Sequence, residues 1–301
     1  MATAKLRQIR RRIRSVQSTR KITRAMELIA ASRIRKAQAR VEAARPYVQR
    51  LVEVVRDLAA QSGVAQHPLL SEREDSSGVH GLVVVTSDRG LCGAYNANVM
   101  RLLEGAIERL GGIENVSIYG VGRKGLTYTK YRGYPVAYEM VGVTDKPSYQ
   151  QAKSLAEVLE SAYLSGKLSR VTVVYTEFYN LVVQRAEEFQ LLPIPKSELA
   201  GGEGFKGEFL FEPSPQEILS ALLPRYVESR LFAAFLEASA SEHASRRKAM
   251  KAATDNADEL LRVLGRIHAR ERQAEITTEI VEVVSGAEAL KEKQLEAAGR
   301  R

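Results

Sequence analysis

The sequence predicts an α/β protein in which two long terminal helices pair as an antiparallel coiled coil and flank a central domain with a mostly parallel sheet. Residues 1–62 contain no glycine and one proline, Pro46, and residues 225–264 contain neither. An α-helix rises about 1.5 Å per residue, so about sixty residues form a rod of roughly 90 Å. Between the helices, β-like runs alternate with helical ones, which is typical of a sheet covered by helices. This arrangement favours a mechanical or scaffolding part over a pocket enzyme.

The first helix, expected over residues 1–60, carries a coiled-coil seam. Apolar residues recur in alternating steps of three and four, and these seam residues are Ile34, Ala37, Val41, Ala44, Val48, Leu51, Val55 and Leu58. Upstream, Leu6, Ile9, Ile13 and Val16 keep the spacing; we expect a phase break around Arg20, after which Ile22, Met26 and Ile29 resume the seam. The length of the pattern indicates a partner helix. An amphipathic helix on a globular core is the weaker interpretation.

The second long helix is expected over residues 214–290. It begins with Ser214-Pro215-Gln216-Glu217, which places a capping Ser, a Pro at the first helical position and a Glu three residues after the cap. A looser apolar stripe follows, made of Leu260, Leu264, Ile267, Ala274, Val281 and Val284. Because this helix is the longer one, antiparallel pairing leaves residues 276–290 without a partner. We therefore expect another protein to surround that end.

The central domain is expected over residues 81–195, between connectors at 61–80 and 196–213. Strand-like runs cover 81–86, 115–121, 135–141, 170–178 and 180–192, and helical patterns cover 96–110 and 148–164. Their alternation predicts a mostly parallel sheet with helices packed on it. The last two strands, joined at Tyr179-Asn180, are expected to form a hairpin on one edge.

The positive charge is concentrated in the first helix. Residues 1–50 hold 15 Lys or Arg against two Glu, a net charge of +13, whereas the rest of the chain carries −4. A basic rod favours an acidic partner: nucleic acid, an anionic membrane surface or an acidic protein. The single cysteine, Cys92, excludes an intrachain disulfide and fits a reducing compartment. No apolar run is long enough to span a membrane, so association with a membrane is expected only through partners.

Two glycine-rich segments follow predicted strands. Gly120-Val-Gly122-Arg-Lys-Gly125 spells G-x-G-x-x-G, but no acidic residue ends the next strand at the spacing that a dinucleotide site requires. Ser87-Asp-Arg-Gly-Leu-Cys-Gly93 lacks the Lys-Ser/Thr of a phosphate loop. Both are interpreted as tight turns between strand and helix. The four histidines have no zinc-type spacing, and sequence places none beside Cys92, so no catalytic, metal or cofactor site is expected.

The basic segment Lys5–Lys36 followed by heptads has the layout of a basic-zipper DNA-binding protein. The seam here is rich in Ala and Val, and a partner helix is available at the other end of the same chain. Nucleic-acid binding is therefore the weaker alternative, as is a dinucleotide-dependent enzyme. The expected partners include no nucleic acid.

Three blocks in order resemble the γ subunits of F-type ATP synthases. The first is Arg20-Lys-Ile-Thr-Arg-Ala-Met-Glu-Leu-Ile-Ala-Ala-Ser32, the second Ser87-Asp-Arg-Gly-Leu-Cys-Gly-Ala-Tyr-Asn96, and the third Ile276-Thr-Thr-Glu-Ile-Val-Glu-Val-Val-Ser-Gly-Ala-Glu-Ala289. The resemblance extends from about Lys5 to Leu290. It implies an antiparallel coiled coil with a Rossmann-like central foot domain.

The resemblance also implies a rotor shaft without a catalytic site of its own. Its partners would be the α3β3 hexamer, the ε subunit and the membrane-embedded c-ring, whose rotation the shaft couples to the nucleotide sites on the β subunits. The expected location is peripheral, at the cytoplasmic face of a bacterial plasma membrane. The tail, residues 291–301, extends beyond the usual end of the family and is expected to be disordered.

The functional residues that the resemblance implies lie on both long helices. Expected contacts of the basic helix face with acidic loops of the β subunits are Arg20, Lys21, Arg24, Arg33, Arg35 and Lys36. Met26 matches a position that is sensitive for coupling, and Arg272, Gln273 and Thr277 match an upper contact with a β subunit. The expected shaft tip, in an apolar sleeve, contains Glu279, Glu282, Gly286 and Ala287.

Overall fold

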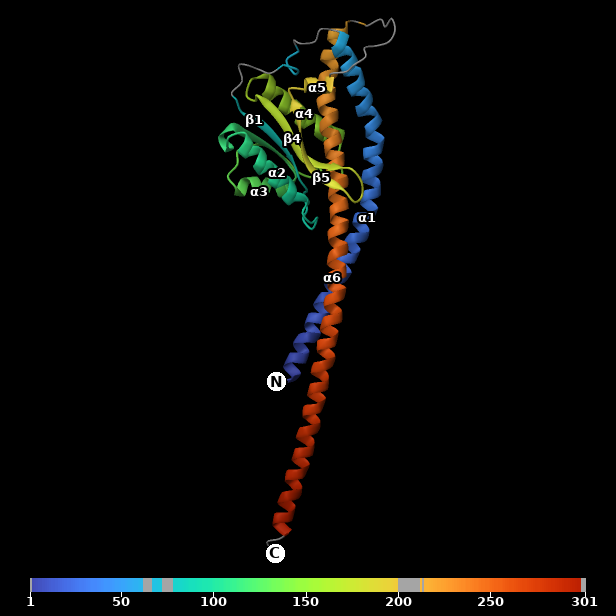
Figure 1. The fold of residues 1–301 in the computed structure, drawn as a ribbon, viewed down its shortest axis with the longest axis vertical. Helices are drawn as coiled ribbons and strands as arrows, with labels where there is room; N and C mark the ends of the chain where they lie inside the picture. Colours follow the sequence, from blue (N-terminus) through green and yellow to red (C-terminus); the bar gives the residue numbers. More distant parts are fainter. Residues whose placement is uncertain (1, 62–66, 72–77, 200–211, 213, 299–301) are drawn as a thin grey trace. The chain divides into compact units, whose positions relative to one another are not determined.

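The computed structural model describes residues 2–61, 67–71, 78–199, 212 and 214–298 (Figure 1). The chain divides into two compact units. The helix-pair unit consists of residues 1–27 and 250–301, and the foot unit consists of residues 28–249. The long helices α1 (Ala2–Gln61) and α6 (Pro215–Ala298) contribute to both units. Most of the expected connectors at 61–80 and 196–213 lies outside the described residues.

The foot unit contains a five-stranded sheet in the order β3-β2-β1-β4-β5. The strands are β1 (His80–Val85), β2 (Val116–Val121), β3 (Val136–Met140), β4 (Arg170–Phe178) and β5 (Gln184–Leu192). The first four run parallel, and β5 pairs antiparallel with β4 at one edge. The expected α/β class, the mostly parallel sheet and the edge hairpin are therefore confirmed.

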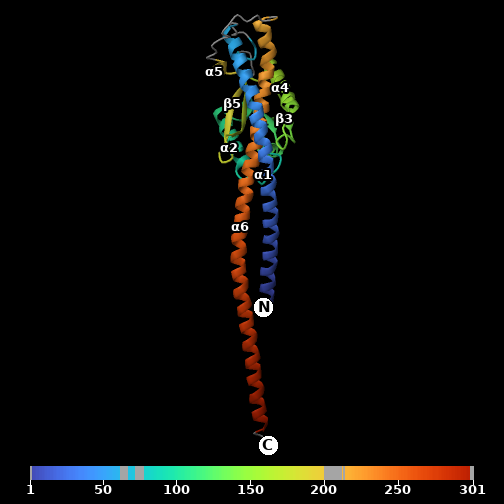
Figure 2. The same ribbon diagram turned by 90° about the vertical axis from the view of Figure 1, so that its right-hand side faces the viewer.

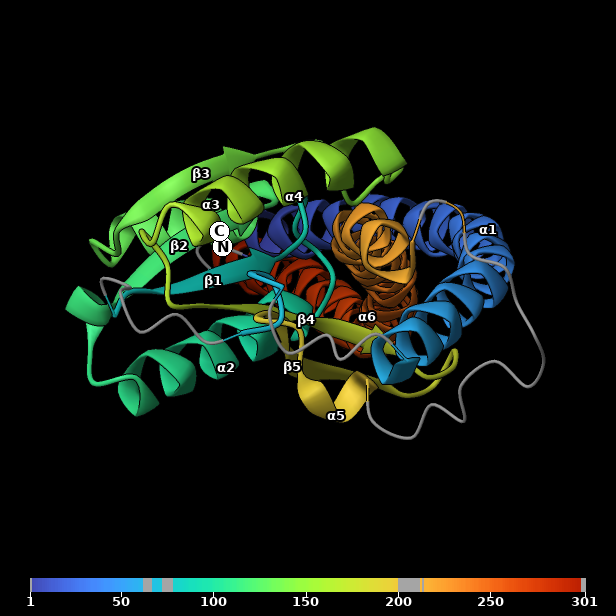
Figure 3. The same cartoon turned by 90° about the horizontal axis from the view of Figure 1, so that it is seen from above.

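Helices cover both faces of the sheet (Figure 3). Leu82 and Val84 of β1 pack with α2 (Tyr95–Arg109) on the face that α3 (Arg123–Tyr131) also covers. Val83 and Val85 point to the opposite face, where α4 (Tyr149–Leu164) and the foot-unit parts of α1 and α6 pack. This alternation follows from the two-residue side-chain period of a strand. The short helices η1 (Ile113–Asn115) and α5 (Lys196–Leu199) complete the unit.

In the foot unit, α1 and α6 pack along the α1 seam. Ile34, Ala37 and Val41 form a core cluster with Leu236, Ala240 and Ala244 of α6 and with Phe178 of β4. Leu51, Val55 and Leu58 enter the main core beside α6 residues such as Leu223 and Val227. Ala44 and Val48 are half-buried. Small residues at several seam positions let the two helix backbones approach closely.

In the helix-pair unit, α1 and α6 are antiparallel, and Figures 1 and 2 both show them side by side. Lys5 pairs with Glu271 at 2.6 Å, Arg20 pairs with Asp258 at 2.7 Å, and the Thr254 hydroxyl donates to the Thr23 hydroxyl at 2.8 Å. Partner numbers fall on α6 as they rise on α1. This order defines the antiparallel direction.

The expected seam phase between Arg20 and Ile29 is wrong. Thr23, Glu27 and Ala30 are buried, whereas Ile22 and Ile29 are 58% and 56% exposed. The three-four spacing therefore continues without a break from Leu6 through Arg20, Thr23, Glu27 and Ala30 to Ile34. Polar residues occupy the middle of the seam because Asp258 and Thr254 supply their partners from α6 and Arg24 pairs with Glu27 at 2.9 Å.

The apolar stripe expected on α6 is displaced in the same way. Met250, Thr254, Ala257 and Leu264 are buried, with Leu261 and His268 half-buried between or after them. Leu260 and Ile267, by contrast, are exposed, so of the large side chains in the paired part of that stripe only Leu264 is buried. Val281 and Val284 are exposed as well, in the segment that was expected to have no partner in this chain. Polar Thr254 and His268 hide the true phase from an apolar pattern search.

The helix α6 ends later than expected. Ser214 caps it, accepting from the backbone N–H of Glu217 at 3.2 Å, as the sequence predicts. It continues through residues 291–298, where disorder was expected, and this expectation is wrong for those residues. Lys291 to Ala298 contains strong helix formers and neither Gly nor Pro, so nothing in that stretch stops the helix. Within the described residues, no helix is both long enough and apolar enough to cross a membrane.

Candidate functional site

The basic face of α1 divides into cations with partners in this chain and cations that remain available. Arg20 and Arg24 are paired with Asp258 and Glu27, and Arg33 is paired with Asp145. Lys21, Arg35 and Lys36 are exposed, and in the described part of the chain they form no ion pair. The sequence could not reveal this division, because Asp145 and Asp258 are distant along the chain.

A basic groove lies in the foot unit where α1 approaches the segment after β3. Arg33, Lys36, Arg40 and Lys146 line a hollow of about 440 Å³, together with Asp145 and the buried side chains of Ser239 and His243. Four cations face one carboxylate there. The groove is therefore electrostatically suited to an acidic partner surface.

Near this face, α1 also exposes apolar side chains. Ile22, Leu28 and Ile29 are each more than half exposed, and Met26 is half-buried. The sequence pattern assigned Ile22, Met26 and Ile29 to the seam, and only Met26 was also expected to contact a partner. The polar residues at the true seam positions were the signal that could have revealed it.

Residues 276–291 of α6 are exposed. Arg272, Gln273, Thr277, Glu279, Glu282, Gly286 and Ala287 all lie on its surface. The Thr277 hydroxyl donates to the Gln273 carbonyl at 2.9 Å. Large apolar side chains are exposed as well, and these are Ile276, Ile280, Val281, Val283, Val284 and Leu290. Several large apolar side chains exposed in one segment are typical of a surface that binds a partner.

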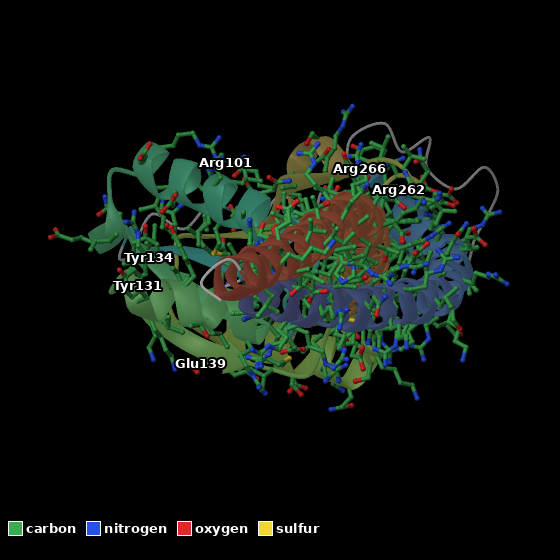
Figure 4. The ribbon with its side chains drawn as sticks, turned by 90° about the horizontal axis from the view of Figure 1, so that it is seen from below. Arg101, Tyr131, Tyr134, Glu139, Arg262 and Arg266 are labelled. Carbon is green, nitrogen blue, oxygen red and sulfur yellow. The ribbon has the colours of Figure 1, made fainter. Side chains whose placement is uncertain are left out.

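Two exposed arginines of α6 precede this apolar end. Arg262 and Arg266 are both exposed, and Figure 4 shows them on the helix. An added Cβ at Gly286 would meet no described atom within 4 Å, so this chain does not itself require the glycine there.

The three glycines of the G-x-G-x-x-G segment contact protein atoms. A Cβ on Gly122, whose φ is +94°, would lie 1.9 Å from the Thr86 carbonyl oxygen. A Cβ on Gly120 would lie 2.3 Å from Leu126 Cδ2, and one on Gly125 2.6 Å from the Thr86 hydroxyl. The glycines thus allow β2 and α3 to pack against the end of β1. The geometry supports the expected turn between strand and helix over a pyrophosphate cradle, and α3 is the helix that follows the turn.

The Ser87–Gly93 loop is held by a network of polar contacts. Asp88 accepts from the backbone N–H groups of Arg123 at 3.1 Å and Gly142 at 3.0 Å, and so joins the ends of three strands. Asn96 accepts from the Ser87 N–H at 3.0 Å, and its side-chain amide donates toward the buried Cys92 sulfur at 3.3 Å. These contacts give Cys92 a packing role. No cluster of His, Cys, Asp or Glu among the described residues has the arrangement of a metal site.

Comparison with known proteins gives one consistent result. A family model described as ATP synthase matches residues 5–290. The protein named ATP synthase gamma chain from Frankia casuarinae is 47% identical over 95% of this chain and 97% of that protein. The one from Acidothermus cellulolyticus is 48% identical with the same coverage.

Solved structures share the fold. A chain of the Euglena gracilis mitochondrial ATP synthase (OSCP/F1/c-ring) is 19% identical, with a TM-score of 0.69 over 96% of this chain and 95% of that one. A chain of the Tetrahymena thermophila mitochondrial ATP synthase central stalk/c-ring is 24% identical, with a TM-score of 0.58 over 77% of this chain and 99% of that one.

Proposed function

Because the chain belongs to the ATP synthase gamma chain family, we propose that it is the central rotor shaft of a proton-translocating F1Fo ATP synthase. It is then one subunit of an ATPase complex. Its work is mechanical, and the β subunits carry the catalytic sites. Rotation of a c-ring turns the shaft, and the shaft changes the nucleotide affinity of the β sites in sequence for ATP synthesis or hydrolysis.

The exposed apolar end of α6 is the observation that carries this proposal. Six large apolar side chains between Ile276 and Leu290 lack cover from the described part of the chain. A surrounding partner removes that surface from water, and each Å² of apolar surface that is buried contributes about 25 cal/mol of stabilising free energy. An α3β3 hexamer that encloses the end of α6 supplies such a sleeve, with Glu279, Glu282, Gly286 and Ala287 at the shaft tip.

Charge supports the same partner. Lys21, Arg35 and Lys36, and the basic groove that Lys36 lines, are available for acidic loops of the β subunits. Exposed ion pairs contribute only about 0–1 kcal/mol each, so the shaft does not bind strongly at any one angle. Arg272, Gln273 and Thr277 are proposed as the upper β contact, and Met26 with its exposed neighbours as the lower one.

The foot unit is proposed to contact the ε subunit and the c-ring. The chain is then peripheral, on the cytoplasmic face of a bacterial plasma membrane, and reaches the membrane only through the c-ring. We propose no nucleic-acid partner and no cofactor. The antiparallel pairing of α1 with α6 argues against a basic-zipper DNA-binding protein. Such a protein pairs its helix with that of a second copy, whereas here the partner helix belongs to the same chain.

Co-purification tests the proposal. A tagged chain, isolated from detergent-solubilised membranes, is expected to bring down α, β, ε and c subunits in a complex that hydrolyses ATP. Recovery of the chain without α, β and c subunits would refute the shaft assignment.

A matched pair of variants tests the sleeve. Val283 is 72% exposed near the end of α6, and Val182 is 77% exposed on the foot-unit hairpin. Neither Val283→Asp nor Val182→Asp should change the stability of the isolated chain, because both side chains are in water. Val283→Asp should lower the yield of assembled complex severalfold, and Val182→Asp should not. Equal yields would argue against an apolar sleeve around this end.

A further inference from the structure

A buried ion pair on α6 holds the Ser87–Gly93 loop of the foot unit. Arg246 and Glu242 lie one helical turn apart, and their side chains pair at 2.7 Å while only 10% and 4% exposed. Arg246 also donates to the carbonyl oxygens of Arg89 and Gly90, both at 3.3 Å. This arrangement, the Arg246 clamp, joins the shaft helix directly to the backbone of the loop.

The clamped loop has a backbone that needs support. Leu91 has a φ of +63°, which is unfavourable for a residue with a branched side chain, and its side chain is exposed. Within the loop, Asp88 contacts the backbone that follows β2, Asn96 of α2 holds Ser87, and Arg246 holds the loop from α6. Tyr95, directly after the loop, adds a second link by donating to the Ala238 carbonyl at 3.2 Å.

The position of the clamp relates it to the topology of the sheet. In the order β3-β2-β1-β4-β5, β2 and β3 are added on one side of β1, and β4 and β5 are added on the other. In open α/β sheets, the crevice at the carboxyl ends of the two strands where this change occurs usually receives a ligand. The loop after β1 stands at that position. Here the guanidinium of Arg246 contacts it, so a side chain of the same polypeptide takes the place that a ligand would take.

We propose that Arg246, oriented by Glu242, is the positioning residue that fixes the rotational position of α6 on the foot unit. Apolar contacts lack direction, so they resist twisting of a helix less well than charge-assisted hydrogen bonds to fixed carbonyl groups do. The clamp lies a few residues before Met250, where the foot unit ends on α6. The functional part, that torque passes through this joint, rests on the proposed shaft function.

Cys92 provides a direct probe of the clamp, because it is the only cysteine of the chain and is 2% exposed within the clamped loop. The rate at which a thiol reagent modifies it in the folded full-length chain reports opening of the loop. Arg246→Met leaves the buried carboxylate of Glu242 without its partner and risks misfolding. The double variant Glu242→Gln/Arg246→Met removes both charges with similar side-chain volumes, so it preserves the fold while the loop contacts are lost.

The double variant should react about ten- to a hundredfold faster than the wild type, which corresponds to the loss of hydrogen bonds from a charged donor. Arg247→Met, at the exposed neighbouring position, is the matched control and should react at the wild-type rate. Arg246→Lys, which retains a cation, should give an intermediate rate. A double variant with wild-type thiol protection and a native circular dichroism spectrum would overturn the clamp.

A second readout tests the torque. In vesicles containing the assembled complex, ATP-driven proton uptake per ATP hydrolysed should fall severalfold in the double variant and stay unchanged in Arg247→Met. If Cys92 reacts rapidly in the double variant while proton uptake per ATP hydrolysed stays at the wild-type value, the functional part of the proposal is refuted. If the wild-type chain does not assemble with α, β and c subunits, the shaft function is refuted. The rate of Cys92 modification still tests the clamp in that case, because it is measured on the chain alone.

Discussion

The hydrogen bond between Thr254 and Thr23 tests the seam phase of the helix-pair unit. The two hydroxyl oxygens are 2.8 Å apart and buried between α1 and α6, and the Thr254 oxygen also lies 2.9 Å from the Met250 carbonyl oxygen one turn earlier, so its single proton is shared between two acceptors. Thr254→Val removes the cross-helix bond with almost no change of volume. Thr278→Val is the matched control, because Thr278 makes the same kind of bond to its own helix, to Ala274, and is exposed.

The expected effect follows from the contacts of each hydroxyl. A buried neutral hydrogen bond contributes about 1 kcal/mol, so Thr254→Val should speed amide exchange in α1 and α6 around this layer about fivefold. Ile22→Ser changes an exposed side chain, and exposed substitutions stay within about 0.5 kcal/mol, or roughly twofold in exchange. If Ile22 were a seam residue, its loss would instead be the larger effect.

Hydrogen exchange of the full-length chain, read by mass spectrometry on peptides from both helices, is the assay. It should be run where exchange reports the opening equilibrium, at several pH values to verify that regime. A Thr254→Val variant that exchanges like Thr278→Val, or an Ile22→Ser variant that exchanges faster than both, would refute the continuous seam.

Three further predictions concern residues of the foot unit. Leu51→Asp buries an unpaired carboxylate in the main core. It should lower the free energy of unfolding, measured by urea titration, by about 3–5 kcal/mol and uncouple ATP hydrolysis from proton pumping. Tyr47→Asp, at an exposed position, should do neither. Burial, reinforced by the charge of Glu177, raises the pKa of Glu237 to about 7. Between about pH 4.5 and 7 the folded state therefore holds a proton that the unfolded state has released, so the free energy of unfolding falls as the pH rises. Glu237→Gln should remove that pH dependence and stabilise the chain at pH 8 by on the order of 2 kcal/mol, measured by thermal unfolding. Reversing Lys36 to Glu should weaken binding to the α3β3 hexamer and reduce its salt dependence; an unchanged Kd at low and high salt would show that this lysine is only solvated.

Much of the fold could be predicted from the sequence because it depends on local patterns. The seam from Ile34 to Leu58 has a strict spacing of apolar residues, and Ser214 announces the start of α6 with a complete capping sequence. The strands of the foot unit are short apolar runs between turn residues. These signals need no knowledge of distant partners.

The errors arose where a partner across the fold decides the outcome. Thr23 is polar, so the pattern excluded it from the seam, yet Thr254 of α6 contacts it there. Glu27 was excluded for the same reason, and its partner Arg24 lies on its own helix. The helix α3 begins at a glycine with positive φ and contains Gly125, which lowers helix propensity, but packing against Thr86 compensates. In the candidate site, the pairing of Arg33 with Asp145 spans 112 residues and could not be read from local sequence.

Direct observation of rotation tests the shaft proposal most closely. Tyr131 is 86% exposed on the foot unit, so a Tyr131→Cys variant in a Cys92→Ser background offers one site for a bead or fluorescent rod. With the α3β3 hexamer immobilised and ATP added, the label should turn in one direction in three equal steps per revolution and stop when ATP is removed. A complex that hydrolyses ATP at its normal rate while the labelled foot stays still relative to the hexamer would contradict the account.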